Sequence, residues 1–315
     1  MKSILAPLVL AFCCAVPVVA VEREVNRTFA VQPGCTLVVE SYHGDIVIVE
    51  SDDAEVRLAL HLDYDVDTEA EADQLRAGLS LVCTSVANTI SIVARHPAET
   101  GPRFSWEENK RMNLYYQISV PRECHLALRT GKGSITVGRI AGRMLARVEE
   151  GTIFFRQVDG SIDASTERGD VIISRCSGSV RARVGRGAIR LGTIGGPSDL
   201  RNSNGGIEVM KALGALTAFA EVGDVMVNFP RETSQPAKLT SSGGNMHVHI
   251  DPEANCEVAA TSTWGRVENS LDFKGGTGTS GRRHLAGRMN EGGPLLQFRA
   301  NGGSVKIEPG ATLFE

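Results

Sequence analysis

Hydrophobic and polar residues alternate in short runs through residues 133–227, and each run is bounded by glycine. In "RGDVIISRCSGSVRARVGRGAIRL", residues 168–191, glycine recurs every nine positions, at Gly169, Gly178 and Gly187. After each glycine the apolar residues occupy every second position, which is the period of a strand with one buried face. The pattern therefore predicts two short strands and two glycine corners in each eighteen-residue unit, and no helix in this part of the chain.

This unit repeats with a fixed period. Its two glycine series are Gly133, Gly151, Gly169, Gly187, Gly205 and Gly223, and Gly142, Gly160, Gly178, Gly196 and Gly214. Equivalent strand positions match in size, as in Ala146, Ala164, Ala182 and Ala218, a column that Leu200 interrupts. A fixed short period is typical of units that bury their apolar side only by stacking on their neighbours. We therefore expect an all-β fold, a parallel β-solenoid, rather than an antiparallel meander, whose columns would not match in size. The rule for parallel crossovers favours a right-handed coil.

The corner motif also recurs outside the regular block. Cys35, Cys124 and Cys256 each precede a glycine by nine residues and each follow a proline. A further copy surrounds Gly303 in "GGPLLQFRANGGSVKIEPG". We therefore expect coils on both sides of the perfect repeat, with the three cysteines at equivalent positions.

A different pattern separates the first coil from the main stack. Residues 66–81 carry acids first and apolar residues at helical spacing, which predicts one helix. Residues 55–63, 88–95 and 113–120 alternate as strands, and 97–111 is a polar loop with Trp106. We expect residues 21–120 to form a small β-rich segment that caps the solenoid region, residues 121–315, because an open sheet end invites pairing with another chain.

The first twenty residues have the features of a secretory signal peptide. Lys2 is the positive end, residues 4–16 are apolar but short for a membrane span, and small residues precede a cleavage site after Ala20. Cys13 offers a lipoprotein alternative, which the bulky Phe12 before it disfavours. We expect an exported protein in the periplasm, at the cell surface or outside the cell.

Composition agrees with an all-β repeat. Aromatic residues are 5% of the 315 residues and glycine accounts for 34, so aliphatic side chains must build the core of a chain that turns often. Residues 129–211 hold fourteen Lys and Arg against eight Asp and Glu, a net of +6 in a chain whose overall charge is −4. Such asymmetry can mark a surface for anionic partners or serve solubility alone.

Five cysteines remain after signal cleavage: Cys35, Cys83, Cys124, Cys176 and Cys256. Export permits disulfides, but five is an odd number and the spacings form no paired CxxC metal pattern, so at least one thiol is free. Cys176 occupies an apolar column, which indicates a buried small side chain. Cys35 and Cys124 can be bridged only if their coils stack directly, and we hypothesise that they are.

Two clusters suggest other chemistry. His247, His249 and Asp251 alternate in "NMHVHID", so a strand would place them on one face as weak candidates for a divalent metal site. We favour a solvated polar face, because a third histidine or cysteine at fitting spacing is missing. We expect no cofactor.

Carbohydrate-active enzymes also use parallel β-helices, and they need clustered carboxylates in an outward groove. Asp163 and Asp199 share a column with Arg181 between them. A charge-compensating ladder on a solvated face explains the same three residues, so we expect no enzyme and retain the carbohydrate-active enzyme as the alternative.

The period of eighteen also predicts a basic stripe. Arg147, Arg183 and Arg201 fall in one outward column, which Ser165 interrupts, and Arg181 lies beside it. This stripe is the candidate binding site for an anionic surface polysaccharide or another cell-envelope component. We expect no nucleic acid partner.

"VQPGCTLVVESYHGDIVI", "YYQISVPRECHLALRTGKGSITV" and the repeated Gly-x-Ile/Val strands, together with the signal peptide, resemble the bacterial putative-adhesin family of β-strand-repeat proteins. This family is usually classed as a domain of unknown function. The resemblance covers nearly all of the mature chain and implies a β-solenoid without catalytic residues. Cys35, Cys124 and Cys256 depart from the small residue usual there. We therefore expect an exported, non-enzymatic binding or structural module.

Overall fold

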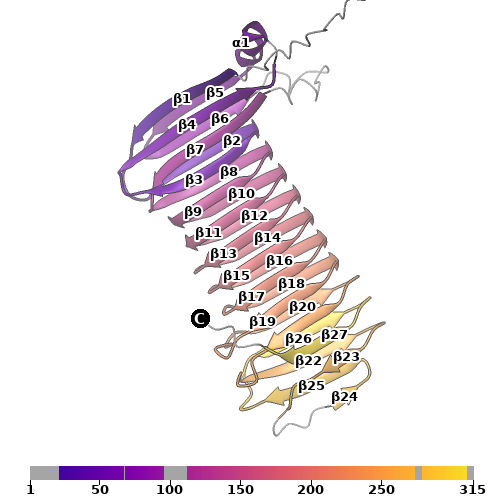
Figure 1. Cartoon of the computed structure of the whole chain (residues 1–315). Coiled ribbons are helices and arrows are strands. Elements are labelled where there is room, and N and C mark those ends of the chain that lie inside the picture. Colours follow the sequence, from indigo (N-terminus) through magenta and orange to yellow (C-terminus); the bar gives the residue numbers. More distant parts are fainter. Residues whose placement is uncertain (1–20, 67, 96–111, 274–278, 311–315) are drawn as a thin grey trace, which may run out of the picture.

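Two long β-sheets stack face to face along an elongated molecule (Figure 1). The computed structural model describes residues 21–66, 68–95, 112–273 and 279–310. Sheet 1 has thirteen strands in the order β1-β4-β7-β3-β9-β11-β13-β15-β17-β19-β21-β27-β23, and sheet 2 has fourteen in the order β24-β25-β22-β26-β20-β18-β16-β14-β12-β10-β8-β2-β6-β5.

The strands of sheet 1, in chain order, are β1 (Val21–Ala30), β3 (Asp45–Ser51), β4 (Glu55–Tyr64), β7 (Met112–Pro121), β9 (Ile135–Ala141), β11 (Ile153–Asp159), β13 (Val171–Cys176), β15 (Ile189–Ile194), β17 (Ile207–Ala212), β19 (Val225–Phe229), β21 (Met246–Ile250), β23 (Val267–Asn269) and β27 (Val305–Pro309). Those of sheet 2 are β2 (Cys35–His43), β5 (Ser80–Val86), β6 (Thr89–Arg95), β8 (Cys124–Lys132), β10 (Met144–Glu150), β12 (Ile162–Arg168), β14 (Val180–Arg186), β16 (Ser198–Asn204), β18 (Leu216–Val222), β20 (Ala237–Ser241), β22 (Cys256–Ser262), β24 (Thr279–Gly281), β25 (His284–Met289) and β26 (Leu295–Ala300).

Successive strands alternate between the two sheets through the middle of the chain, and neighbours within a sheet are parallel. Their register joins residues eighteen positions apart, as in Ala146 with Ala164 on β10 and β12, and Val171 with Ile189 on β13 and β15. The all-β fold with mostly parallel sheets is thus as the sequence predicted. The right-handed sense of the coil stays a prediction.

The core lies between the inner faces of the two sheets, where alternate residues of both form one buried cluster. Cys176 belongs to this cluster with 1% of its surface exposed. Its Sγ donates to the carbonyl of Gly160 at 3.2 Å, and burial raises the pKa of its thiol. The buried location predicted for Cys176 is confirmed.

Polar side chains also enter the core beside one corner. Register partners down this column are Thr130, Val148, Thr166, Val184, Asn202, Ala220, Ser241 and Ala300, so polar and apolar residues alternate from coil to coil. Thr166 Oγ1 donates to the carbonyl of Gly151 at 3.2 Å, and Asn202 Nδ2 donates to that of Gly187 at 2.8 Å. Burying a hydroxyl or amide donor is costly unless it is hydrogen-bonded, and the corner carbonyls accept from these donors. Within the described residues, Asn202 Oδ1 has no hydrogen-bond partner.

Between β3 and β8 the chain builds one end of the two sheets, where β6 pairs in parallel with β2 and β7 pairs in parallel with β3. In between it forms β4, α1 (Glu69–Ala77), β5, β6 and β7 before Cys124 pairs with Cys35. The pairs β1–β4, β4–β7 and β5–β6 are antiparallel, unlike the stack. These strands lie at the end of the molecule that carries α1 (Figure 1), and we call β1, α1 and β4 to β7 the cap. Both sheets continue across residue 121, and the division of the chain at that residue stays a prediction.

The helix is shorter than its predicted range of 66–81. The side chain of Thr68 caps its first turn by accepting from the Glu71 amide at 3.3 Å, and Gly78 caps its other end. Ser80 and the residues after it pair with β6 as strand β5, so the predicted end of the helix is wrong. The predicted strands 55–63, 88–95 and 113–120 correspond to β4, β6 and β7. The predicted loop 97–111 lies outside the described residues.

At the other end the spatial order departs from the chain order. β26 lies between β20 and β22 in sheet 2, and β27 lies between β21 and β23 in sheet 1. The last motif of the chain, around Gly303, therefore inserts between two earlier coils. Antiparallel strands β25 and β24 follow β22 and close this end. Within the described residues, no helix is long and apolar enough to cross a membrane.

Candidate functional site

Arginine side chains form a column across the outer face of sheet 2. In spatial order its positions are Arg129, Arg147, Ser165, Arg183, Arg201, Phe219, Thr240 and Arg299. All five arginines are exposed. Neighbouring strands lie about 4.8 Å apart, so the column presents its charges at nearly regular intervals. We call this set the arginine column.

The structure places Arg147, Arg183 and Arg201 in the single column that the period of eighteen predicted, with Ser165 as its gap. Sequence reasoning missed Arg129 and Arg299. Arg129 follows the second cysteine motif, whose spacing from Cys124 could have revealed it. Arg299 enters the column only because β26 inserts beside β20, and no periodic signal reports that insertion.

The four arginines from Arg129 to Arg201 differ in how their charge is balanced. Arg201 Nε lies 3.3 Å from an oxygen of Asp199, and Arg129 Nη2 lies 3.7 Å from one of Glu149. Within the described part of the chain, Arg147 and Arg183 form no ion pair. The centre of the column therefore holds two guanidinium groups that are exposed and without an acidic partner in the structure.

Like charges also lie directly side by side in this column. Arg129 is the register partner of Arg147, and Arg183 is the register partner of Arg201. Adjacent like charges on one face of a sheet are destabilising. An anion bound along the column would relieve this repulsion, because a guanidinium group pairs well with carboxylate, phosphate or sulfate oxygens.

A groove runs beside the column, along the first residues of β10 to β18. Its volume is about 590 Å³. Asp163, Arg181 and Asp199 line it as register partners on successive strands, as the sequence predicted for these three residues. Arg143 lies at one end of the groove and Thr217 at the other. The groove thus contains a row of alternating charges that runs beside the arginine column.

Both groove carboxylates already contact an arginine. Asp163 Oδ2 lies 3.6 Å from Arg181 Nη1, and Asp199 pairs with Arg201. The side chains of Asp163 and Asp199 are 37% and 33% exposed, so water reaches both. Asp163, Arg181 and Asp199 thus form a row of alternating charges on a water-accessible surface.

His247 and His249 lie at alternate positions of β21, and Asp251 follows the strand. Their neighbours on the flanking strands are Met226, Asn228, Lys306 and Glu308. Lys306 Nζ lies 2.8 Å from Glu308 and lowers the pKa of that carboxyl group. Asp251 Oδ1 accepts from the backbone of Glu253 at 2.8 Å. In the described ranges no three His, Cys, Asp or Glu side chains are placed to hold a metal ion.

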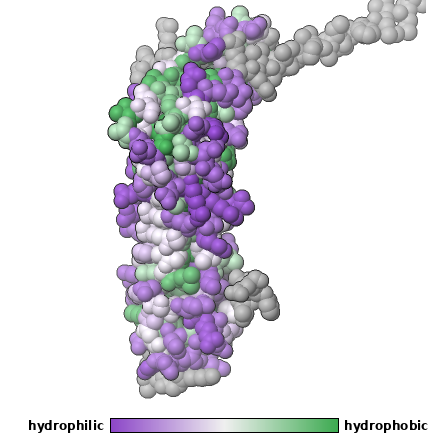
Figure 2. Space-filling model, turned by 90° about the vertical axis from the view of Figure 1, so that its left-hand side faces the viewer, coloured by the Kyte–Doolittle hydropathy of each residue, from purple (hydrophilic) through white to green (hydrophobic). Residues whose placement is uncertain are grey.

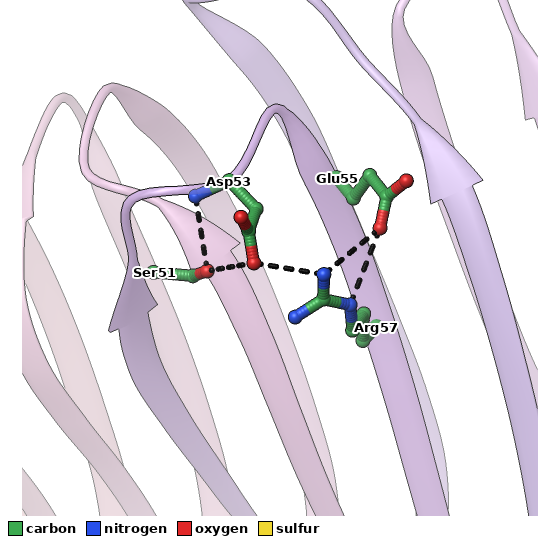
Figure 3. Close-up of polar contacts among 4 residues, drawn as sticks. All are labelled: Ser51, Asp53, Glu55 and Arg57. Carbon is green, nitrogen blue, oxygen red and sulfur yellow. Dashed lines mark hydrogen bonds and ion pairs between the residues drawn. The ribbon is translucent and has the colours of Figure 1, made fainter.

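A second charged cluster lies at the turn between β3 and β4 (Figure 3). Arg57 Nη2 lies 2.8 Å from Asp53 Oδ2, and Arg57 Nε donates to Glu55 at 3.2 Å. Ser51 Oγ accepts from the Asp53 amide at 3.2 Å. These contacts satisfy one another within the turn that leads from β3 to β4, so the cluster leaves few polar groups available to a ligand.

The face turned to the viewer in Figure 2 shows where apolar side chains reach the surface. Hydrophilic side chains spread over the middle of the molecule, and hydrophobic ones gather mainly towards the end that carries the cap (Figure 2). Phe219 stands in the arginine column itself, 40% exposed. It is the one aromatic position of that column.

Comparison with known proteins gives structural similarity alone. No family model matches the sequence, and no curated protein matches it. Among solved structures, a "putative adhesin" from Bacteroides fragilis is 14% identical, with 90% of this chain and 97% of that chain covered and a TM-score of 0.45. A "putative adhesin" from Parabacteroides merdae is 8% identical, with coverage of 90% and 96% and a TM-score of 0.46. A "putative lipid binding protein" from Parabacteroides distasonis is 14% identical, with the same coverages and TM-score. Bacterial proteins named as adhesins are thus among those similar to this chain, as the sequence resemblance predicted.

Proposed function

We propose that this protein is an exported, non-enzymatic β-solenoid that acts as a binding or structural module in the periplasm or at the cell surface. Its arginine column binds an anionic polymer, an acidic surface polysaccharide or another cell-envelope component. The proposal includes a right-handed coil and a capping segment, residues 21–120, in front of the solenoid, residues 121–315. Export rests on the signal peptide predicted in residues 1–20.

The observation that carries the proposal is that positively charged arginine side chains recur along the arginine column, from strand to strand of sheet 2. A stack of parallel strands presents equivalent side chains about every 4.8 Å, which suits a linear polymer with a charge on each repeating unit. Arg147 and Arg183 supply the unpaired charges at the centre, and the net positive charge of residues 129–211 attracts a polyanion from a distance. Individual exposed contacts are weak, so affinity depends on several of them acting together.

A carbohydrate-active enzyme is the alternative, and the groove is the observation in its favour. Asp163 and Asp199 line it with Arg181 between them. Both carboxylates contact arginines and water, which supports a binding groove over a hydrolytic one. Cleavage of a polysaccharide that is lost in an Asp163→Asn variant would establish the enzyme.

The proposal is tested by binding to alginate, an acidic polysaccharide, with neutral dextran as the control polymer. The parent is compared with a column variant, Arg147→Ser, Arg183→Ser and Arg201→Ser. The matched control is Arg139→Ser, Arg156→Ser and Arg175→Ser, which removes the same charge from exposed positions of sheet 1. Melting temperatures establish that all three proteins are folded.

We expect the parent and the sheet 1 variant to bind alginate at low salt and the column variant to lose about three- to 150-fold in affinity, since three exposed contacts of about 0.2–1 kcal/mol each are removed. Binding should weaken at moderate salt, because exposed charges are screened over about 8 Å at physiological ionic strength. Failure of the parent to bind at low salt, or equal losses in both variants, would contradict the proposed site.

A further inference from the structure

Two buried cysteines meet where the cap joins the stack. Cys35 opens β2 and Cys124 opens β8, and the two are register partners in sheet 2. Neither has any exposed surface, and their Sγ atoms lie 3.2 Å apart, joined by a hydrogen bond. They stand 89 positions apart in the chain, on either side of the segment that forms most of the cap.

We propose that Cys35 and Cys124 form a disulfide that ties β2 to β8 when the chain folds in an oxidising environment. A disulfide requires Cα atoms about 4.4–6.8 Å apart, and register partners on neighbouring strands meet that requirement. The short distance between the sulfurs shows that both side chains point toward one another inside the core. The bond would close the loop that contains β3 to β7.

The other three cysteines that the structure describes have no comparable partner. Cys256 repeats the same sequence motif, but its Sγ faces the thioether of Met289 at 3.8 Å. Cys176 donates to corner carbonyls, and Cys83 lies on β5 at the edge of the cap. Among these cysteines, Cys35 and Cys124 are therefore placed to form a disulfide only with each other.

The two thiols have different reactivity. The hydrogen bond between the two sulfurs lowers the pKa of the Cys35 thiol, whereas the same hydrogen bond, with burial second, raises the pKa of the Cys124 thiol. Wherever this pair has formed, Cys35 is therefore the more nucleophilic thiol, because the thiolate is the reactive form. Since both sulfurs are buried in the folded protein, the exchange takes place while β2 and β8 are still assembling.

The oxidant is a small-molecule disulfide such as oxidised glutathione. The Cys35 thiolate attacks one of its sulfurs, and a mixed disulfide forms as one glutathione thiolate leaves. Cys124 then loses its proton to the released thiolate and attacks the Cys35 sulfur, and the second glutathione leaves. The protein loses two electrons and two protons, and one oxidised glutathione becomes two reduced ones.

Peptide mapping without reduction tests the bond. The chain is refolded from urea with oxidised and reduced glutathione, alkylated and cut with trypsin. Cleavage after arginine places Cys35 in residues 28–57 and Cys124 in residues 123–129. We expect one linked species about 2 Da below the sum of the two peptides. Recovery of residues 123–129 as an alkylated free peptide, or linked to another cysteine, would overturn the proposal.

A second measurement does not depend on mapping. Reductant should lower the melting temperature of the refolded parent by roughly 5–10 °C, because the disulfide restrains the unfolded chain. A Cys35→Ser, Cys124→Ser double variant should not respond to reductant, and a Cys176→Ser variant should respond as the parent does. If reductant leaves the melting temperature of the refolded parent unchanged, the proposed disulfide is also contradicted.

Discussion

The carbonyl oxygen of Gly151 occupies the space that a Cβ atom on Gly169 would need. Gly169 also has φ of +140°, a conformation that side chains rarely adopt. At this corner, adjacent coils thus contact each other through backbone atoms, with no room for a side chain. This contact explains why glycine recurs with a fixed period in a chain that otherwise forms strands.

Gly169→Ala should therefore lower the free energy of unfolding by about 1–3 kcal/mol, through backbone strain and the overlap with Gly151. Urea denaturation at neutral pH measures the loss. Gly206→Ala is the matched control, because the nearest atom to its added Cβ is the Asp224 oxygen at 3.3 Å and its φ is not positive. Equal losses of unfolding free energy in the two variants would show that the contact between stacked corners does not require glycine at position 169.

Thr166→Val should cost about 0.5–1.5 kcal/mol of stability, the net contribution of one hydrogen bond. Valine has nearly the volume of threonine, and Val148 and Val184 already occupy the neighbouring positions of this buried column. The substitution removes only the hydrogen bond to the Gly151 carbonyl. Urea denaturation measures it, and a stability gain would mean that the buried hydroxyl is not satisfied there.

Burial raises the pKa of the Cys256 thiol to about 11, from an ordinary value near 9. Above pH 9 the unfolded chain loses this proton while the folded protein keeps it, so the stability that burial of the neutral thiol provides is lost as pH rises. The loss between pH 9 and pH 11 should reach about 2–3 kcal/mol.

This alkaline effect is isolated by comparing the parent with Cys256→Ala in urea at pH 7, 9 and 10.5. The alanine variant should be less stable at pH 7, and the difference between the two proteins should shrink as the pH rises. A difference that stays constant across the three values would place the thiolate in contact with water in the folded state.

Much of this architecture could be predicted from the sequence because it is local and periodic. The spacing from Gly151 to Gly169 predicts the length of one coil, and the alternation of Val171 and Ile173 predicts which face of the strand is buried. The matching motifs at Cys35 and Cys124 predict a further coil before the cap in the chain. Arg147, Arg183 and Arg201 followed from the same period, since equivalent positions in parallel strands must form columns.

What the sequence could not show depends on long-range order. β27 lies beside β21 although 54 residues separate Ile250 from Val305, and no local pattern states which coil a distant motif will join. Arg299 was missed for that reason. Ser80 was assigned to the helix because its edge pairing with β6 is a tertiary contact that overrides propensity.

The most direct test of the arginine column is to fill its gap. Ser165 lies between Arg147 and Arg183, so Ser165→Arg creates an unbroken row of arginines from Arg129 to Arg201. Ser174→Arg adds the same charge at an exposed position of β13 in sheet 1. Affinity for alginate at low salt is measured for both variants and the parent. The account predicts that Ser165→Arg binds about two- to five-fold more tightly than Ser174→Arg, the gain expected from one exposed ion pair, whereas equal affinities of the two variants would contradict a binding site on this column.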